Sequence, residues 1–163
     1  MYLILDSSAL LSGRFNSIPA GYDGVLITPL VCDEVAKGAP SRLMDGLLDA
    51  GLDIRGPAST EKAEVAARAT GDLGSLSKAD ISVIALALEV SDAIVVTDDF
   101  RVQNVLGSMG MKFESAGEIG ERKIARVWSW TYRCRGCGRY FEEEQRRDEC
   151  PVCGSNVRKY KKK

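Results

Sequence analysis

Tyr2-Leu3-Ile4-Leu5-Asp6 is a short apolar run followed at once by an acid. A continuous apolar run of this length is typical of a strand that is buried on both faces of a parallel sheet. A second run, Ala93-Ile94-Val95-Val96-Thr97, is also followed by an acid, Asp98. Parallel strands end at one edge of their sheet, where open α/β folds place their binding sites. We therefore expect Asp6 and Asp98 to meet at that edge.

Strand and helix patterns alternate around these two runs as far as residue 113. The remaining strands are predicted at 25–28, 52–55 and 111–113, and helical spacing appears at 7–11, 29–37, 41–50, 60–69, 78–90 and 99–109. This alternation favours an α/β fold whose parallel sheet is covered by helices on both faces. Residues 114–127 mix glycines with charges, and we interpret them as a linker.

The composition limits the available chemistry. The chain has 163 residues and no histidine, which excludes Ser-His-Asp triads, histidine acid–base pairs and histidine metal ligands. Residues 1–113 carry 9 Lys+Arg against 15 Asp+Glu, whereas residues 114–163 carry 13 against 8. An acidic body with a basic end suits a protein that holds cations in one part and contacts polyanions with the other.

The sequence shows neither a secretory leader nor an uncharged apolar run near the ~18 residues of a membrane span. We therefore expect a cytoplasmic protein with no membrane partner. Thiols stay reduced in that compartment, so the cysteines are expected to bind metal rather than to form disulfides.

Two further acids, Glu34 and Asp80, fall on predicted helices at positions that turn inward, Glu34 beside Leu30 and Asp80 on the face of Ile84. Two carboxylates ~4 Å apart repel by about 4 kcal/mol at an effective dielectric of roughly 20. A divalent cation bound between the acids would remove this repulsion.

Each acid also has a purely structural interpretation. Ser77 to Asp80 has the spacing of a capping box, and Asp98 and Asp99 could complement the dipole of the next helix. Glu34 taken alone is typical of a surface charge. Independent capping residues need not converge on one edge of a sheet, so convergence of the four acids would favour the metal site.

The basic end contains Cys134-Arg135-Gly136-Cys137 and Cys150-Pro151-Val152-Cys153, two C-x-x-C pairs separated by 12 residues and each followed by glycine. Two such turns place four thiolates at the corners of a tetrahedron, the arrangement that zinc prefers. We expect one structural zinc ion in a ribbon over residues 128–157, followed by a basic tail at 158–163. A site filled by four cysteines should not be catalytic.

Aromatic and basic residues accompany the cysteines. Such interleaving can stack bases and follow phosphates, so we expect RNA contacts, although the tryptophans could equally form the core of the ribbon. The candidate RNA-binding residues are Arg126, Trp128, Trp130, Arg133, Arg135, Arg139 and Lys161.

Four segments resemble the acidic motifs of PIN-domain nucleases, in the same order. They are Ile4-Leu5-Asp6-Ser7-Ser8-Ala9, Glu34 after Thr28-Pro29, the stretch from Leu76-Ser77 through Asp80 to Ala87, and Val96-Thr97-Asp98-Asp99. Within PIN proteins, the stretch from Thr97 to Val105 and the attached zinc ribbon look like the Nob ribosome-biogenesis endonucleases. Members of that family cut precursor small-subunit rRNA to form its mature 3′ end.

The resemblance implies a PIN-like three-layer α/β/α domain over residues 1–113 and an active site built on acids. Asp6, Glu34, Asp80 and Asp98 would be the catalytic residues and bind one or two Mg²⁺ or Mn²⁺ ions, with Ser7, Ser8 and Asp99 in supporting roles. The implied partners are pre-rRNA, the small ribosomal subunit precursor and assembly factors. The alternatives are a toxin-type PIN nuclease that acts on tRNA or mRNA, and a non-catalytic RNA- or ribosome-binding adaptor.

Overall fold

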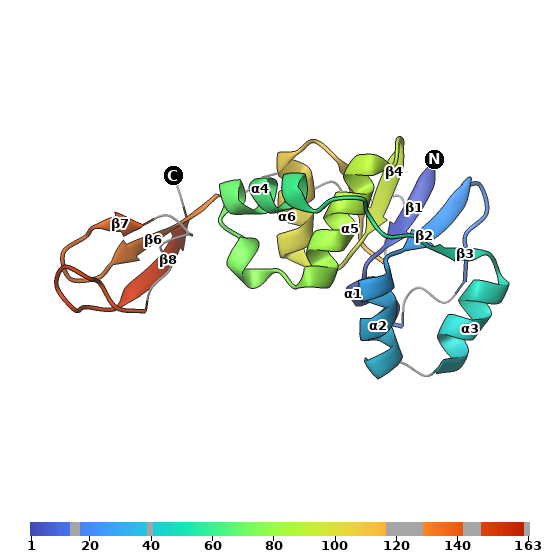
Figure 1. Cartoon of the computed structure of the whole chain (residues 1–163), viewed down its shortest axis with the longest axis horizontal. Coiled ribbons are helices and arrows are strands. Elements are labelled where there is room, and N and C mark those ends of the chain that lie inside the picture. The colour runs from blue at the N-terminus through green and yellow to red at the C-terminus, as the bar shows by residue number, and fades with distance from the viewer. Residues whose placement is uncertain (14–16, 39–40, 117–128, 142–147, 162–163) are drawn as a thin grey trace.

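The computed structural model describes residues 1–13, 17–38, 41–116, 129–141 and 148–161 (Figure 1). Its first part alternates strands with helices. The strands are β1 (Tyr2–Leu5), β2 (Gly24–Ile27), β3 (Leu52–Ile54), β4 (Ala93–Val96) and β5 (Lys112–Glu114). The helices are α1 (Ser7–Leu11), α2 (Pro29–Gly38), α3 (Ser41–Asp49), α4 (Glu61–Thr70), the 3-10 turn η1 (Leu73–Ser75), α5 (Lys78–Glu89) and α6 (Phe100–Ser108). Each predicted strand and helix is confirmed to within one residue at its ends, and η1 was not predicted.

The five strands form one parallel sheet in the order β3-β2-β1-β4-β5. The order reverses between β1 and β4, which lie side by side with Leu5 opposite Val96. The carboxyl ends of these two central strands border the crevice in which open α/β sheets bind their ligands. Asp6 and Asp98 follow the ends of these strands.

The core confirms the three-layer α/β/α arrangement. Successive residues of β1, Leu3 to Leu5, and of β4, Val95 and Val96, are all fully buried, which requires cover on both faces of the sheet. Ala116 is also buried in this core, so the compact body extends past residue 113, where the predicted domain ended. Within the part of the chain that is described, no helix is long and apolar enough to cross a membrane.

The second part is a small antiparallel sheet in the order β7-β6-β8, formed by β6 (Trp130–Cys134), β7 (Tyr140–Phe141) and β8 (Val157–Lys161). Tyr132 and Phe141 form its core together with two of the cysteines. Residues 158–161, predicted as the start of a basic tail, instead belong to β8. Their charges do not prevent strand formation, because the backbone pairs with β6 while the charged ends extend from the sheet.

The small sheet contacts the first body at the turn after α4. Gly71 ends that helix with a φ of 76°, and a Cβ atom at this position would lie 2.8 Å from the carbonyl oxygen of Trp130. The next residue, Asp72, is 1% exposed. Its carboxylate accepts hydrogen bonds from Asn104 Nδ2 at 2.7 Å and from Lys159 Nζ at 3.3 Å, and the same ammonium group lies 5.0 Å from the centre of the Trp130 ring. A buried carboxylate of the first body thus binds a cation of the second.

Candidate active site and zinc site

Asp6 occupies the junction between β1 and α1. It is 1% exposed and is the N-cap of α1, where its Oδ1 accepts a hydrogen bond from the backbone nitrogen of Ser7 at 2.7 Å. Its Oδ2 accepts hydrogen bonds from Ser8 Oγ at 2.6 Å and from Thr97 Oγ1 at 2.7 Å. A carboxylate that accepts hydrogen bonds from three donors is held in a fixed orientation, as a metal ligand needs to be.

Hydroxyl groups join Asp6 to the end of β4. Ser8 Oγ, which donates to Asp6, accepts a hydrogen bond from the backbone nitrogen of Asp98 at 2.9 Å. Thr97 Oγ1 likewise donates to Asp6 and accepts from the backbone nitrogen of Asp99 at 3.1 Å. The two strand ends therefore meet at one edge, as the sequence pattern indicated, and Ser8 lies between them, while its supporting role stays a prediction.

Asp98 and Asp99 differ in their surroundings. The Asp98 carboxylate accepts hydrogen bonds from Ser115 Oγ and from the backbone nitrogen of Ala116, the latter at 3.1 Å, and so holds the segment after β5. Asp99 is the N-cap of α6, and its Oδ1 accepts from the backbone nitrogen of Arg101 at 2.8 Å and from Arg101 Nε at 3.2 Å. Each acid stabilises the local backbone, but Asp99 also acts on the acid described next.

Asp80 and Glu34 lie on opposite sides of Ser77. Ser77 and Asp80 form a reciprocal capping box, in which the Ser77 nitrogen donates to Asp80 Oδ2 at 2.7 Å and the Asp80 nitrogen to Ser77 Oγ at 3.1 Å. Ser77 Oγ also donates to Glu34 Oε1 at 3.4 Å. The capping interpretation of Asp80 is therefore confirmed, and the cap also links Asp80 to Glu34, which is half-buried.

The pKa of Asp80 marks this capping residue as more than structural. The pKa of Asp80 is raised to about 6, mainly by burial and in smaller part by the charges of Asp6 and Asp99, while the hydrogen bonds with Ser77 oppose the shift. A bound cation would stabilise the ionised form of a carboxyl group whose pKa is raised by burial and by neighbouring carboxylates. The electrostatics thus associate Asp6, Asp80 and Asp99.

Hydrogen bonds place the acids in two groups, Asp6 with the backbone of Asp98 and Asp99, and Asp80 with Glu34 through Ser77. Among the described residues, the only group of three or more possible ligands whose binding atoms all lie within 4.8 Å of one another is the cysteine group. Mg²⁺ does not require a closed cage of protein ligands, because it keeps several waters and binds through one or two carboxylates plus a phosphate of the substrate.

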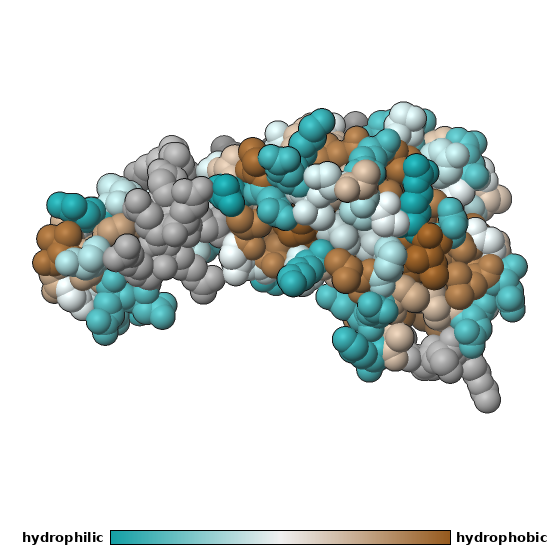
Figure 2. All heavy atoms as spheres, viewed as in Figure 1, coloured by the Kyte–Doolittle hydropathy of each residue, from teal (hydrophilic) through white to brown (hydrophobic). Residues whose placement is uncertain are grey.

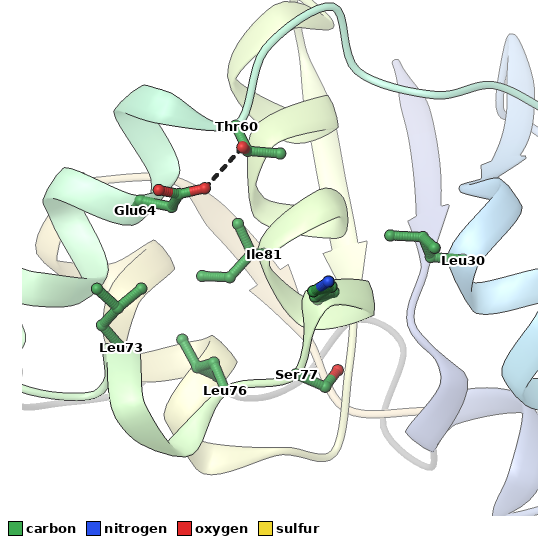
Figure 3. A pocket seen from close by; sticks show the side chains of 8 residues that line it. Leu30, Thr60, Glu64, Leu73, Leu76, Ser77 and Ile81 are labelled. Atoms are coloured by element: carbon green, nitrogen blue, oxygen red, sulfur yellow. Dashed lines mark hydrogen bonds between the residues drawn. The ribbon is translucent and has the colours of Figure 1, made fainter.

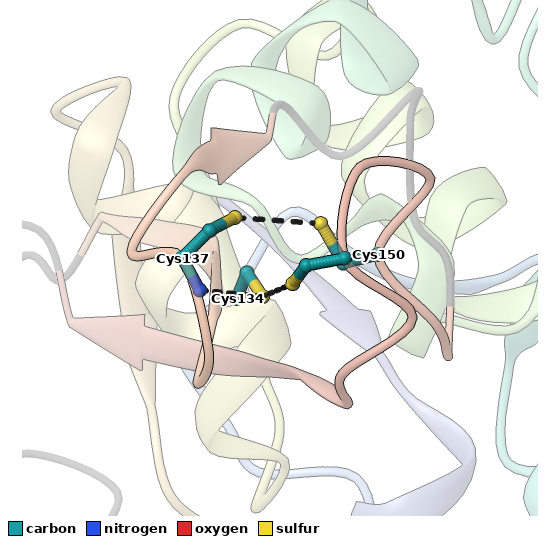
Figure 4. Close-up of side chains that lie close together, drawn as sticks. Cys134, Cys137 and Cys150 are labelled. Carbon is teal, nitrogen blue, oxygen red and sulfur yellow. Dashed lines mark hydrogen bonds between the residues drawn. The ribbon is translucent and has the colours of Figure 1, made fainter.

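The four cysteines form a compact group with the geometry of a zinc site (Figure 4). Cys134 Sγ lies 3.4 Å from Cys153 Sγ, and Cys137 Sγ lies 3.6 Å from Cys150 Sγ. All four sulfur atoms lie within 4.8 Å of one another. A tetrahedral ion with Zn–S bonds of about 2.3 Å requires sulfur–sulfur separations of about 3.8 Å, so the group could bind zinc. None of the four is in a disulfide.

The backbone helps to prepare this site. The nitrogens of Gly136 and Cys137 donate to Cys134 Sγ at 3.3 and 3.4 Å. Hydrogen bonds from Ser155 lower the pKa of Cys153 to about 6. Both features favour thiolates, the form in which cysteine binds metal.

Comparison with known proteins assigns the chain to a family. A model of the "PIN domain of ribonuclease" matches residues 3–90. The chain belongs to the PIN-domain ribonucleases. Full-length similarity supports this assignment: the chain is 36% identical over 158 residues to Endoribonuclease Nob1 of Archaeoglobus fulgidus, which covers 94% of this chain and 87% of the relative.

Further relatives extend the similarity. Endoribonuclease Nob1 of Pyrococcus abyssi is 38% identical over 159 residues, covering 96% of this chain and 91% of that protein. Ribonuclease VapC1 of Thermoplasma acidophilum is 33% identical over 163 residues, covering 98% and 78%. A PilT N-terminus domain protein from Sulfolobus solfataricus has a TM-score of 0.52 at 20% identity over 77% of this chain and 100% of that chain, and supports the fold. The chain is thus a Nob1-type PIN nuclease that acts on RNA.

The candidate RNA-binding residues beyond the PIN domain have mixed surroundings. Arg126 and Trp128 lie outside the described residues. Trp130 is partly buried where the ribbon meets Gly71. Arg133 lies 5.3 Å from the centre of the Tyr140 ring. The exposed candidates are Arg133, Arg135, Arg139 and Lys161. Their binding to RNA stays a prediction.

Two residues that organise the candidate site, Thr97 and Ser115, were given no role in the sequence analysis. Thr97, which is fully buried, contacts Asp6 and Asp99, and Ser115 contacts Asp98. A hydroxyl residue directly after a buried strand and before two acids was a signal for Thr97. Ser115 had no such signal, because its role depends on the pairing of β5 with β4.

Proposed function

We propose that this protein is a metal-dependent endoribonuclease that cleaves precursor small-subunit rRNA to produce its mature 3′ end. The observation that carries the proposal is the hydrogen-bond network at the ends of β1 and β4, in which Ser8 and Thr97 donate to Asp6 and accept from the backbone nitrogens of Asp98 and Asp99. Support for the substrate comes from the relatives named Endoribonuclease Nob1 and from the attached cysteine ribbon.

The proposed ligands of the catalytic metal are Asp6, Glu34, Asp80 and one of the two acids after β4. Asp6 is held by three donors, while Ser77 positions both Glu34 and Asp80. Of the acids after β4, Asp99 is the stronger candidate, since its charge acts on Asp80. Asp98 was the sequence-based choice, and the two can be separated by mutation.

Bound Mg²⁺ or Mn²⁺ would supply an activated water and neutralise the charge that develops on the phosphate oxygens. The chain's own residues orient the ion and the RNA. Because the protein has no histidine, the carboxylates at this edge are the nearby groups that can accept a proton. In-line attack on phosphorus with the 3′ oxygen as leaving group would yield a 5′-phosphate and a 3′-hydroxyl.

The ribbon of residues 129–161 is proposed to hold one structural zinc ion and to present its exposed arginines to RNA. Its partners would be the pre-rRNA within the small-subunit precursor and the assembly factors on that particle, in the cytoplasm. RNA affinity that falls steeply with added salt would support phosphate contacts by the ribbon.

The proposal is tested with a pre-rRNA fragment that spans the mature 3′ end, incubated with Mn²⁺ or with EDTA, followed by mapping of the RNA ends. We expect one cut at the mature end in Mn²⁺, none in EDTA, and none with the Asp6→Asn variant. Asp45→Asn, which removes an exposed acid of α3, is the matched control and should cut normally. Full activity of Asp6→Asn would overturn the assignment.

A second candidate has support from the similarity to Ribonuclease VapC1. A toxin-type nuclease would use the same acids on tRNA or mRNA. The same reactions with those RNAs decide between the two, because a pre-rRNA enzyme should leave them intact. RNA binding without metal-dependent cutting of any substrate would instead indicate an adaptor.

A further inference from the structure

A mainly apolar pocket of about 410 Å³ lies directly beside the catalytic edge (Figure 3). Leu73, Leu76 and Ile81 form its walls, and Leu30 of α2 closes one side. On the surface, apolar side chains interrupt the hydrophilic ones in the region of α4 and α5 (Figure 2). The volume is within the range of about 300–1,000 Å³ that small ligands occupy.

The pocket is continuous with the acids through Ser77. This residue lines the pocket and also binds both Asp80 and Glu34. An RNA whose scissile phosphate lies at the acids would place a neighbouring nucleotide beside Ser77. Lys78, at the same rim, carries a positive charge suited to a backbone phosphate.

The far wall offers a hydrogen-bond acceptor. Glu64 is half-buried in this wall, and its Oε1 accepts a hydrogen bond from Thr60 Oγ1 at 2.7 Å. That bond fixes the direction of the carboxylate, which can accept hydrogen bonds from the N–H groups of a base edge. Apolar walls that hold the faces of a base, with one acceptor at its edge, are the features used to bind an unstacked base.

We propose that this pocket binds the nucleobase next to the cut and prefers guanine, which presents two adjacent N–H donors to the Glu64 carboxylate. The proposal rests on the proposed function, since it deepens the specificity of the same site. It also requires the RNA to be single-stranded at the cut, because a base inside a duplex cannot enter the pocket.

The test uses short single-stranded RNAs based on the mature 3′ end, in which each nucleotide flanking the cut is in turn guanosine, uridine or abasic. Cleavage rates are measured in Mn²⁺ for the full-length wild type and for Leu76→Trp, whose larger side chain fills the pocket. Val65→Trp is the matched control, because Val65 is 58% exposed on α4 and does not line the pocket.

For the wild type and Val65→Trp we expect about tenfold slower cleavage when one particular flanking nucleotide is abasic, a ratio that corresponds to the loss of one stacked base. Leu76→Trp should cleave the guanosine and abasic RNAs at equal rates. Glu64→Gln, which keeps the pocket open, should lose the preference for guanosine over uridine and retain the preference for a base over none.

Equal wild-type rates on guanosine and abasic RNAs would overturn the subsite and leave the nuclease proposal intact. If the wild type cuts no RNA in Mn²⁺, the proposed function fails instead, and the pocket is then tested by titrating guanosine 5′-monophosphate against ribose 5-phosphate. Shifts of the Leu73, Leu76 and Ile81 methyl resonances with the nucleotide alone would support base binding, and their absence would overturn it. A Leu76→Trp defect that appears only on assembled pre-ribosomal particles would also overturn it, in favour of a protein ligand.

Discussion

The two candidate metal sites are built in opposite ways. The cysteines come from two short turns of one small sheet, and their sulfur atoms all lie within 4.8 Å of one another. The acids come from the ends of β1 and β4, from the middle of α2 and from the first turn of α5. Hydroxyl groups of Ser8 and Thr97 bind Asp6, and that of Ser77 binds Glu34. We therefore expect the ribbon to depend on a bound metal for its shape, whereas the acidic edge takes its shape from a hydrophobic core.

The largest expected effect is that of zinc removal on the ribbon. Cys150→Ser removes a buried ligand, and structural zinc contributes on the order of 10 kcal/mol to folding. Hydrogen exchange should show loss of protection at Tyr132 in β6 and unchanged protection at Ile4 in β1. The control, Cys32→Ser, changes a cysteine outside the zinc group and should preserve both. Simultaneous loss in β1 would show that the two bodies do not fold independently.

The second prediction separates the two acids after β4. Asp99→Asn should slow single-turnover cleavage by about 100-fold, which is about 2.7 kcal/mol, because the variant removes a charge that acts on Asp80. Asp98→Asn should slow it by less than about tenfold and should mainly loosen Ser115 and Ala116. Rates are measured at saturating Mn²⁺. A larger loss of rate for Asp98→Asn than for Asp99→Asn would indicate that Asp98 is the metal ligand.

A third, smaller effect concerns the junction between the two bodies. Lys159→Met leaves the Asp72 carboxylate buried without its cation and should lower the free energy of unfolding by about 2 kcal/mol, measured by urea titration. Adding Asp72→Asn should recover part of this loss, because the buried charge is then absent. Lys62→Met in α4 is the control, an exposed lysine of that helix. If the changes in unfolding free energy of Lys159→Met and Asp72→Asn simply add in the double variant, the two residues do not stabilise each other.

The smallest predicted effect distinguishes a functional acid from a capping residue. The pKa of Asp80 is raised in the folded, metal-free protein, so its ionisation opposes folding once the pH exceeds the unfolded value near 4, and increasingly up to about 6. Asp80→Asn should therefore stabilise the metal-free protein by about 1 kcal/mol at pH 8, after allowance for solvent screening, and not at all below pH 4. Thermal unfolding at the two pH values measures this. If Asp80→Asn instead destabilises the protein at pH 8, the loss of the capping box with Ser77 outweighs the gain from removing the charge.

Metal affinity should show the same dependence on pH. Asp80 must lose its proton to bind a cation, so Mn²⁺ affinity should fall as the pH drops through about 6, and higher Mn²⁺ should restore cleavage at pH 5.5. Cleavage at low Mn²⁺ that stays constant between pH 5 and 8 would contradict a ligand role for Asp80.

The sequence predicted the fold well because the deciding signals are local. The apolar runs of β1 and β4, each closed by an acid, determine both the buried strands and the edge where the site lies. Asp6 could be placed in this way, and the cysteine pairs carry their geometry in their spacing. The pocket beside Ser77 could not be predicted, because Leu30 of α2 and Leu73 of η1 come to line one pocket only through the packing of α2 and α4 against α5.

The role of Asp72 was equally hidden from the sequence. It follows Gly71 in what looks like an ordinary helix ending, and nothing nearby in the chain indicates a partner 87 residues away. Likewise, the choice between Asp98 and Asp99 depends on side-chain directions that two adjacent, identical residues cannot reveal in a pattern.

The contact of Asp72 with Lys159 has a geometric consequence for how an RNA is cut. If the exposed arginines of the ribbon bind RNA, as proposed, an anchor at the end of α4 would limit how far they can move relative to the acids. The distance between the RNA bound to the ribbon and the acids would then set the cleavage position, at a fixed number of nucleotides from the bound segment. Such an enzyme would select its cleavage position by distance along the RNA. Weakening the contact between Asp72 and Lys159 would then make the 3′ ends of the product heterogeneous.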